Sequence, residues 1–472
     1  EYVIEVIYDF IRSKNFKFQS YMSASKFYQN YALKSDDGEE ILESYEDKVL
    51  IVALTLGDGD SKLAKDIAGK LINQEFQPAT PTFLNAGRAR AGKMVSCFLV
   101  NIEDSCEGIS YGVSSANHLS KIGGGVALNL TRLRAAGESI KGIKGAAGGV
   151  MGVAKLLEQS FSYFNQMGAR QGAGAVYLNV LHPDFETLLD SKKINADEKI
   201  RLTTLSIGAI IPDKFMELAE KNENCYAFYP HSIYQKYGVH LDEIKMDEWY
   251  DKLAQDDEIE KKEINPRELL TRIAQTQQES GYPYVVFIDS ANQQHTLKDV
   301  GMIKMSNLCC EIFQYQTPSD IKGYGQVSDW GQDISCNLGS LNIANVMDNK
   351  DIEKTVDVAI RALTYVSDNT NIEEVPTIKK GNDSSHSIGL GAMNLHGYLV
   401  REDIIYTSKE AREFADVFFA MMRYYSIKTS MNIAIEKGEK FNGFEKSEYA
   451  KGEESELFKK YCTKDFLPTS EK

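Results

Sequence analysis

Apolar residues recur at steps of three and four in the first part of the chain. Residues 45–54 (YEDKVLIVAL) and 63–71 (LAKDIAGKL) both carry this spacing, which predicts amphipathic helices. Pro78 and Pro81 punctuate the end of the region, since proline interrupts helices. We therefore expect a helical region over residues 1–80.

The pattern changes to short apolar runs and many glycines between residue 81 and about residue 210. Residues 95–100 and 176–180 predict buried strands, and residues 150–164 predict a helix between them. Such alternation favours parallel strands joined by helical crossovers, so the predicted fold class is α/β.

The second half of the chain mixes both patterns. The charged stretch 241–264 predicts exposed helices or a surface insertion. Residues 284–288, the segment around Cys309 and residues 335–346 read as strands, whereas 355–367 and 411–438 read as long helices. No internal repeat or low-complexity tract interrupts this order.

Composition narrows the class of protein. With 472 residues, 43% hydrophobic and 26% charged, the chain is long enough for a large catalytic domain with an appended helical region. A net charge of -15 disfavours a general nucleic-acid surface, and no apolar run is long enough for a membrane span. The first residues lack the basic start of a signal peptide, so we expect a cytoplasmic protein without membrane or nucleic-acid partners. The seven cysteines are too few for a secreted disulfide scaffold and point to catalytic or redox thiols.

The segment SNLCCE at residues 306–311 is the strongest candidate for chemistry. In an extended strand, alternate residues share a face, so Asn307, Cys309 and Glu311 would point the same way. A thiol would then lie between a hydrogen-bonding amide and a proton acceptor. The alternative is a buried strand with a structural cysteine, and the hexapeptide alone leaves both readings open.

Two further cysteines change this balance. Cys97 lies in the apolar run VSCFLV, and Cys336 lies in SCNLGSLN. Together with Asn307, Cys309 and Glu311, they resemble the large, catalytic subunit of class I ribonucleotide reductase. The stretches SASKFY (23–28), PTFLNAG (81–87) and SIGLGAMNLHGY (387–398) are similar to its class Ib form.

The resemblance implies a role for each active-site residue in reducing ribonucleoside diphosphates to deoxyribonucleotides. Cys309 would become the thiyl radical, and Glu311 would act as the base. Cys97 and Cys336 would form the redox pair, while Asn307 would orient the ribose hydroxyls. The remaining cysteines, Cys106, Cys225 and Cys462, are expected to be structural or exposed, and Cys310 departs from the family pattern.

The resemblance also implies the fold and its division into domains. We expect residues 81–472 to form the ten-stranded reductase-type α/β barrel, incomplete at its C-terminal side, with Cys309 at the tip of a loop inside it. The family's radical-relay tyrosine pair, phosphate loop and terminal cysteine pair have no counterpart in the sequence. An alternative to a complete reductase is therefore a catalytically incompetent nucleotide-binding part that needs a second chain.

Nucleotide contacts follow from the same resemblance. Thr80 and Ser96 match positions that hold the substrate diphosphate, and Gly125 belongs to a glycine run that allows close approach of a ligand. Ordinary turn residues are the alternative. The sequence between residues 123 and 149 contains no Walker A motif.

The resemblance also implies an allosteric specificity site nearby, with solvated surface charges as the alternative. Asp104 and Ser105 would bind the effector ribose, and Arg134 and Lys141 would meet its phosphates. Arg170 and Gln171 lie in a glycine-flanked loop that matches the one reporting effector identity to the substrate base.

The expected partners complete the prediction. We expect no metal bound by this chain, because its seven histidines show no ligand pattern such as His-Glu-x-x-His. The radical would come from a metal-containing small (beta) subunit, and a glutaredoxin- or thioredoxin-like protein would restore the thiols. Effectors would be dNTPs or ATP with Mg²⁺, and the chain would form a homodimer.

Overall fold

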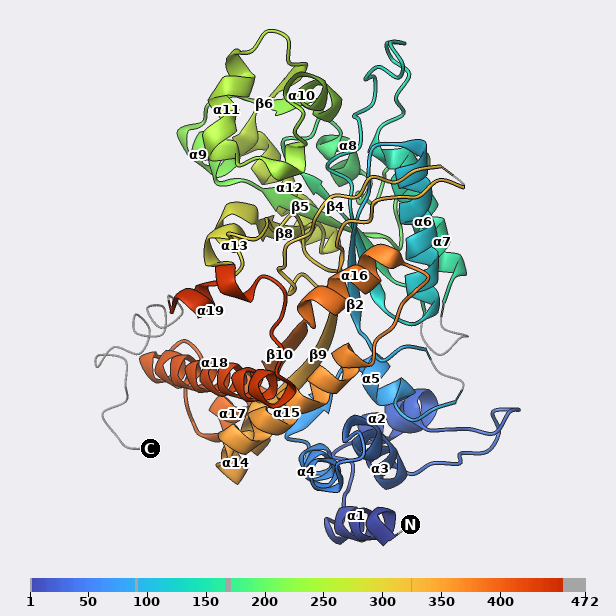
Figure 1. Cartoon of the computed structure of the whole chain (residues 1–472). Helices are drawn as coiled ribbons and strands as arrows, with labels where there is room; N and C mark the ends of the chain where they lie inside the picture. Colours follow the sequence, from blue (N-terminus) through green and yellow to red (C-terminus); the bar gives the residue numbers. More distant parts are fainter. Residues whose placement is uncertain (1, 90–91, 166–170, 324, 453–472) are drawn as a thin grey trace. The chain divides into compact units, whose positions relative to one another are not determined.

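The structure is a computed structural model that describes residues 2–89, 92–165, 171–323 and 325–452 (Figure 1). The chain forms two compact units, each of which is discontinuous in sequence. The first unit contains Glu1–Ser96, Cys336–Asn371 and Asn382–Lys472, and the second contains Cys97–Ser335 and Ile372–Gly381. The predicted boundary at residue 80 stays a prediction.

The N-terminal part of the first unit is helical, as the apolar spacing predicts. Its elements are α1 (Tyr2–Ser13), α2 (Tyr21–Lys26), η1 (Phe27–Tyr31), α3 (Tyr45–Leu56), α4 (Ser61–Ile72) and α5 (Thr80–Asn85). Helix α3 begins with a capping box between Ser44 and Asp47, and α4 begins at the N-cap Asp60. The two predicted helices over 45–54 and 63–71 are thus confirmed, with their apolar faces in the core of the unit.

The second unit is built on a parallel sheet. Its strands are β2 (Cys97–Asn101), β3 (Gly125–Asn129), β4 (Gly174–Asn179), β5 (Ser206–Ile211) and β8 (Tyr284–Phe287), paired in that order. Every residue of β2, β3, β4 and β5 is buried, as expected of strands covered on both faces. The predictions of strands at 95–100 and 176–180 are confirmed.

Helical crossovers join these parallel strands. The connecting helices include α6 (Cys106–Lys121), α7 (Val150–Tyr163), α8 (Phe185–Asp190), α9 (Asp213–Lys221), α10 (Pro230–Tyr237) and α12 (Pro266–Ser280). Figure 1 shows α6 and α7 packed side by side in this unit. The helix predicted over 150–164 is confirmed as α7, and so is the predicted α/β class.

The first unit has a smaller set of strands. Strand β1 (Phe76–Pro78) is antiparallel to β9 (Ile334–Asn342), and β10 (Ile388–Met393) runs parallel to β9. Helix α15 (Ile352–Asp368) packs against α18 (Lys409–Lys437), as Figure 1 shows. Both helices agree with the predictions over 355–367 and 411–438. The strand predicted over 335–346 is confirmed up to Asn342 as β9, and the remaining residues begin α14 (Ile343–Asn349).

The charged stretch 241–264 only partly fits its prediction. It forms η2 (Leu241–Glu243), α11 (Met246–Gln255) and β7 (Lys261–Ile264), and α11 confirms the predicted helix. Strand β7 pairs with β6 (Cys225–Phe228). The expected exposure is wrong at Asp242, which is buried. Arg132, far away in sequence, lies 2.9 Å from its carboxylate and compensates the buried charge.

Shorter elements complete the described chain. They are α13 (Ile288–Gln294), α16 (Pro376–Ser385), α17 (Leu395–Arg401), η3 (Phe444–Lys446) and α19 (Glu448–Lys451). None of the described helices is long and apolar enough to cross a membrane.

Candidate active site

The segment around Cys309 is a tight turn. The backbone N–H of Cys310 donates to the carbonyl of Asn307 over 3.1 Å, and Cys310 has a φ of +63°. A non-glycine residue rarely adopts this left-handed conformation. The predicted extended strand is therefore wrong here, and the turn exposes Cys309 while it buries Asn307.

The side chain of Asn307 contacts two other predicted site residues, Glu311 and Cys97. Its Oδ1 accepts the backbone N–H groups of Glu311 at 2.9 Å and Ile312 at 3.0 Å. Its Nδ2 donates to Oε1 of Glu311 over 2.8 Å and lies 3.5 Å from Sγ of Cys97. The side-chain amide of Asn307 thus closes the turn that contains Cys309 and brings Glu311 and Cys97 to it.

Contacts with the parallel sheet hold this turn in place. The hydroxyl of Tyr177, in β4, donates to the carbonyl of Asn307 over 2.7 Å. The thiol of Cys310 lies 3.7 Å from the carbonyl of Val285, in β8. Burial raises the pKa of Tyr177, and the neighbouring Cys310 raises it further, so this phenol stays a neutral donor. Tyr177 is a functional candidate that sequence reasoning missed, because nothing in the apolar run 176–180 distinguishes it.

The glycine run before β3 is explained by close packing. A Cβ on Gly124 would lie 2.2 Å from the ring of Phe98, and one on Gly125 would lie 3.0 Å from Cδ2 of Leu308. The absence of side chains here lets the Cys309 turn approach β3. A ligand contact of Gly125 stays a prediction.

Three predicted site residues belong to the first unit. Cys336 is buried in β9, and its carbonyl accepts the backbone N–H of Ser96 over 3.3 Å. Thr80 begins α5, and its hydroxyl lies 3.0 Å from the hydroxyl of Tyr31. Ser96 and Cys336 are therefore neighbours within this unit, while their roles stay predictions.

Three of the residues predicted to bind an effector lie close to one another, namely Asp104, Ser105 and Arg134. Nε of Arg134 lies 2.7 Å from Oδ2 of Asp104, and Ser105 caps α6 by accepting the N–H of Gly108 over 2.9 Å. Lys141 is exposed at the tip of a short hairpin closed by Ile140 and Ile143. Asp104, Ser105 and Arg134 thus lie at the start of α6, which also suits an anion because backbone N–H groups point outward there.

The loop predicted to link effector and substrate is described only in part. Gln171 is exposed, and Arg170 lies outside the described residues. The role of both residues stays a prediction.

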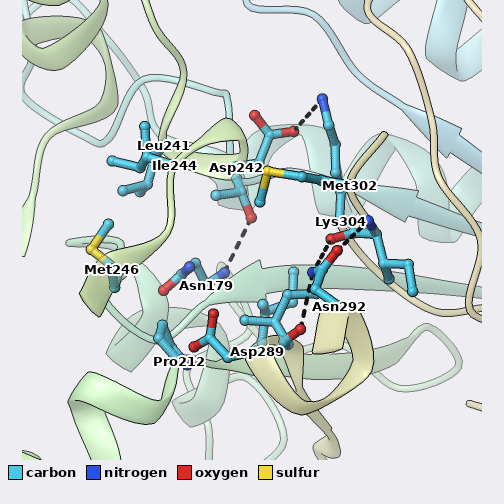
Figure 2. A pocket seen from close by; sticks show the side chains of 14 residues that line it. Asn179, Pro212, Leu241, Asp242, Ile244, Met246, Asp289, Asn292, Met302 and Lys304 are labelled. Atoms are coloured by element: carbon cyan, nitrogen blue, oxygen red, sulfur yellow. Dashed lines mark hydrogen bonds and ion pairs between the residues drawn. The ribbon is translucent and has the colours of Figure 1, made fainter. Parts of the chain in front are cut away.

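A small cavity lies elsewhere in the second unit. It measures about 20 Å³, room for roughly one water molecule, and its polar wall includes Asn179, Asp242, Asn292 and Lys304 (Figure 2). None of the predicted site residues lines it. Over the described ranges, no group of three or more His, Cys, Asp and Glu residues is arranged to hold a metal ion.

Two family models match the chain. The barrel domain of ribonucleotide reductase matches residues 95–470, and the all-alpha domain of ribonucleotide reductase matches residues 17–91. Both agree with the predicted reductase-type α/β fold and its N-terminal helical region, which are thereby confirmed.

Similar proteins carry the same description. A protein of Bacillus subtilis (strain 168) named ribonucleoside-diphosphate reductase subunit alpha is 51% identical over 469 residues, which are 99% of this chain and 67% of the relative. Proteins of the same name from Mycoplasma pneumoniae and Mycoplasma genitalium are 46% and 45% identical, over 93% and 98% of this chain. These matches cover 60% and 64% of the two Mycoplasma proteins, so the chain spans about two thirds of its relatives' length.

Proposed function

Because the chain belongs to the large-subunit family of ribonucleotide reductases, we propose that it carries the thiol active site of a class Ib ribonucleoside-diphosphate reductase. The observation that supports this most directly is the cluster of Asn307, Glu311 and Cys97 at the turn that exposes Cys309. An amide, a carboxylate and thiols are the groups that the reaction needs.

The first half of the proposed reaction activates the ribose. The sulfur radical of Cys309 takes the 3' hydrogen, so that an S–H bond forms and the C3'–H bond breaks. Glu311 accepts the proton of the 3' hydroxyl, which assists loss of the 2' hydroxyl as water. Asn307 holds the carboxylate of Glu311 through Nδ2.

The second half supplies electrons. Cys97 and Cys336 give one proton to the leaving hydroxyl and one proton with two electrons to the sugar, and their sulfurs join in a disulfide. Glu311 returns its proton to the 3' oxygen, and the 3' hydrogen then returns from Cys309, which restores its radical. A glutaredoxin- or thioredoxin-like protein reduces the disulfide before the next turnover.

The proposal extends to partners and regulation. The radical originates in a metal-containing small (beta) subunit, and the chain acts as a homodimer. Deoxynucleoside triphosphates or ATP, with Mg²⁺, bind at Asp104, Ser105, Arg134 and Lys141. Arg170 and Gln171 transmit the identity of the effector, while Thr80, Ser96 and Gly125 help to hold the substrate diphosphate.

A second candidate is a nucleotide-binding part that needs another polypeptide for chemistry. It rests on the residues proposed to meet an effector, of which Asp104, Ser105 and Arg134 lie together at the start of α6. The two candidates differ in turnover but agree on effector binding.

One experiment separates them. The chain is mixed with a class Ib small subunit, a dithiol reductant, Mg²⁺ and a labelled ribonucleoside diphosphate, with and without dNTP. Deoxynucleotide formation would support the reductase. Saturable dNTP binding without turnover would support the nucleotide-binding part. The absence of both turnover and dNTP binding would contradict both candidates.

A further inference from the structure

A buried carboxyl group outside the proposed reaction ties several segments of the second unit together. Asp333 lies just before β9, and only 4% of its surface is exposed. Its Oδ1 accepts the backbone N–H of Asn101 at 3.1 Å and Nε2 of Gln316 at 2.8 Å. Its own backbone N–H donates to the carbonyl of Thr377 over 3.0 Å.

The groups around this carboxyl all serve as donors. Hydrogen bonds from Thr377, Asn101 and Gln316 favour its charged form, but burial is the larger effect and raises the pKa of Asp333 to about 6. Charged or neutral, the group works here as an acceptor. An apolar residue at this position would leave buried donors unpaired.

Two of the connected segments carry proposed catalytic residues. Asn101 is the last residue of β2, the strand that begins with Cys97. Gln316 lies in the segment that follows the Cys309 turn and Glu311, and its Nε2 is also 3.4 Å from the carbonyl of Leu99 in β2. Asp333 and Gln316 therefore hold the strand of Cys97 and the segment after Cys309 at two neighbouring points.

The contact between Asp333 and Thr377 connects these two segments to helices. The hydroxyl of Thr377, in α16, lies 2.9 Å from the hydroxyl of Tyr111 in α6. Tyr111 also accepts the backbone N–H of Thr377 over 3.3 Å. Since α6 packs on β2 and β3, the carboxyl of Asp333 is fixed from the helical side as well.

We propose that Asp333 is a positioning residue, which sets the distance between Cys97 and the Cys309 turn by accepting hydrogen bonds from both connected segments. It touches neither substrate nor sulfur. The inference rests on the proposed function for its effect on turnover, but its effect on thiol geometry is independent of any reaction.

Three variants test this role. Asp333→Asn keeps an oxygen that accepts from Asn101 and Gln316, whereas Asp333→Leu removes both acceptors. Glu158→Leu is the matched control, because Glu158 is also buried and accepts the backbone N–H groups of Thr203, Thr204 and Leu205. That control creates unpaired donors at Thr203, Thr204 and Leu205, which belong neither to the strand of Cys97 nor to the Cys309 turn.

The first readout needs no enzymatic activity. The alkylation rate of Cys97 by iodoacetamide, followed by mass spectrometry below the unfolding temperature, reports how tightly its strand is held. We expect Asp333→Leu to raise this rate at least about fivefold, and Asp333→Asn and Glu158→Leu to stay within about twofold of the parent, because local opening exposes buried groups.

The second readout is turnover by the complete reductase with its small subunit. Asp333→Leu should lower kcat at least about tenfold with little change in KM, because small displacements of reacting groups are costly. Asp333→Asn should restore kcat to within about threefold of the parent, as expected if the acceptor oxygen is what matters.

Two outcomes would overturn the inference. One is that Asp333→Leu lowers only the melting temperature, as Glu158→Leu does, with alkylation and kcat unchanged. The other, if Asp333→Leu does not fold, is that Gln316→Met leaves the alkylation rate of Cys97 at the parent value. A parent protein without turnover would contradict the proposed function and leave the alkylation test valid.

Discussion

Asn307 and Glu311 are joined by two hydrogen bonds that use both ends of one amide. Nδ2 of Asn307 donates to the carboxylate of Glu311 over 2.8 Å, and Oδ1 accepts the backbone N–H of the same residue over 2.9 Å. The amide therefore fixes the backbone and the side chain of Glu311 together. A proposed general base that is held in this way needs no reorganisation before it accepts a proton.

The variant Asn307→Asp tests this arrangement. It places a second carboxylate beside Glu311 and removes the donor, so like charges repel and the base is displaced. We expect kcat for nucleotide reduction to fall by about two orders of magnitude or more. Asn292→Asp is a suitable control, because Asn292 also bridges backbone groups, those of Ile288 and Ile303, and should leave kcat nearly unchanged.

A buried ion cluster controls the stability of the second unit. Arg132 contacts Asp242 at 2.9 Å, Glu103 at 2.7 Å and Glu243 at 2.6 Å. Burial alone would raise the pKa of Asp242, but the charges of Arg132 and Lys304 outweigh it and lower that pKa. Arg132→Met should lower the free energy of unfolding by about 3–5 kcal/mol, because it removes the main compensating charge of a buried carboxylate and leaves only Lys304, 3.6 Å away.

Denaturant unfolding measures this loss. The exposed pair Lys221–Glu217 offers a control, since Lys221→Met should change the free energy of unfolding far less than Arg132→Met does. Equal losses in the two variants would contradict the assigned importance of the cluster.

Two buried glutamates predict opposite pH dependences of stability. Burial raises the pKa of Glu138 from 4.5 to about 7. The backbone hydrogen bonds from Ala135 and His231 lower this pKa, but burial is the larger effect. The folded protein then holds the proton more tightly than the unfolded chain. This contribution is fully present below pH 4.5 and is lost as the pH rises towards 7.

Glu158 has the reverse sign. Burial would raise its pKa, but the N–H donors of Thr203, Thr204 and Leu205 outweigh burial and lower it. Its contribution is present above the ordinary pKa of 4.5 and is lost as the pH falls through the lowered value.

Urea unfolding between about pH 3 and pH 7.5 measures both slopes. The stability of Glu138→Gln relative to the parent should rise with pH, and that of Glu158→Gln should fall with pH at the acidic end. The directions assigned to the two pKa shifts would be contradicted if the stabilities of both variants, relative to the parent, changed in the same direction with pH.

Arg134 provides a test of the proposed effector site. Its guanidinium lies 2.7 Å from Asp104, at the start of α6, and 19% of its side chain is exposed. Arg134→Gln should raise the dissociation constant of a dNTP by about tenfold or more, since a charge-assisted hydrogen bond to phosphate is lost.

Isothermal titration calorimetry measures this change. Arg272→Gln is the matched control, because Arg272 is similarly exposed and also pairs with carboxylates, those of Glu186 and Asp190. A loss of affinity equal to that of Arg134→Gln would contradict a specific role for Arg134.

Local patterns predicted most of the regular structure. The helices over 45–54 and 63–71 have apolar faces at the correct spacing, and the strand at 176–180 is a short apolar run. These signals lie within the helices and strands themselves. The arrangement of these elements as a reductase-type barrel was predicted from the family resemblance alone.

Contacts between distant segments were not predictable in the same way. The Cys309 turn depends on the left-handed Cys310 and on the hydroxyl of Tyr177, which lies in a strand far away in sequence. Asp242 reads as a surface charge until Arg132 is placed beside it. Such features arise from tertiary packing, so residue type and spacing alone do not reveal them.

Cys309→Ser gives the most direct test of the central claim, that Cys309 is the residue that activates the substrate. The serine keeps the size of the side chain and its exposed turn position, but its O–H bond is too strong to exchange a hydrogen atom with the ribose. With small subunit, reductant and effector present, we expect deoxynucleotide formation to disappear while the dissociation constant of the ribonucleoside diphosphate stays within about twofold of the parent. Turnover at a rate close to that of the parent would contradict the proposed role of Cys309.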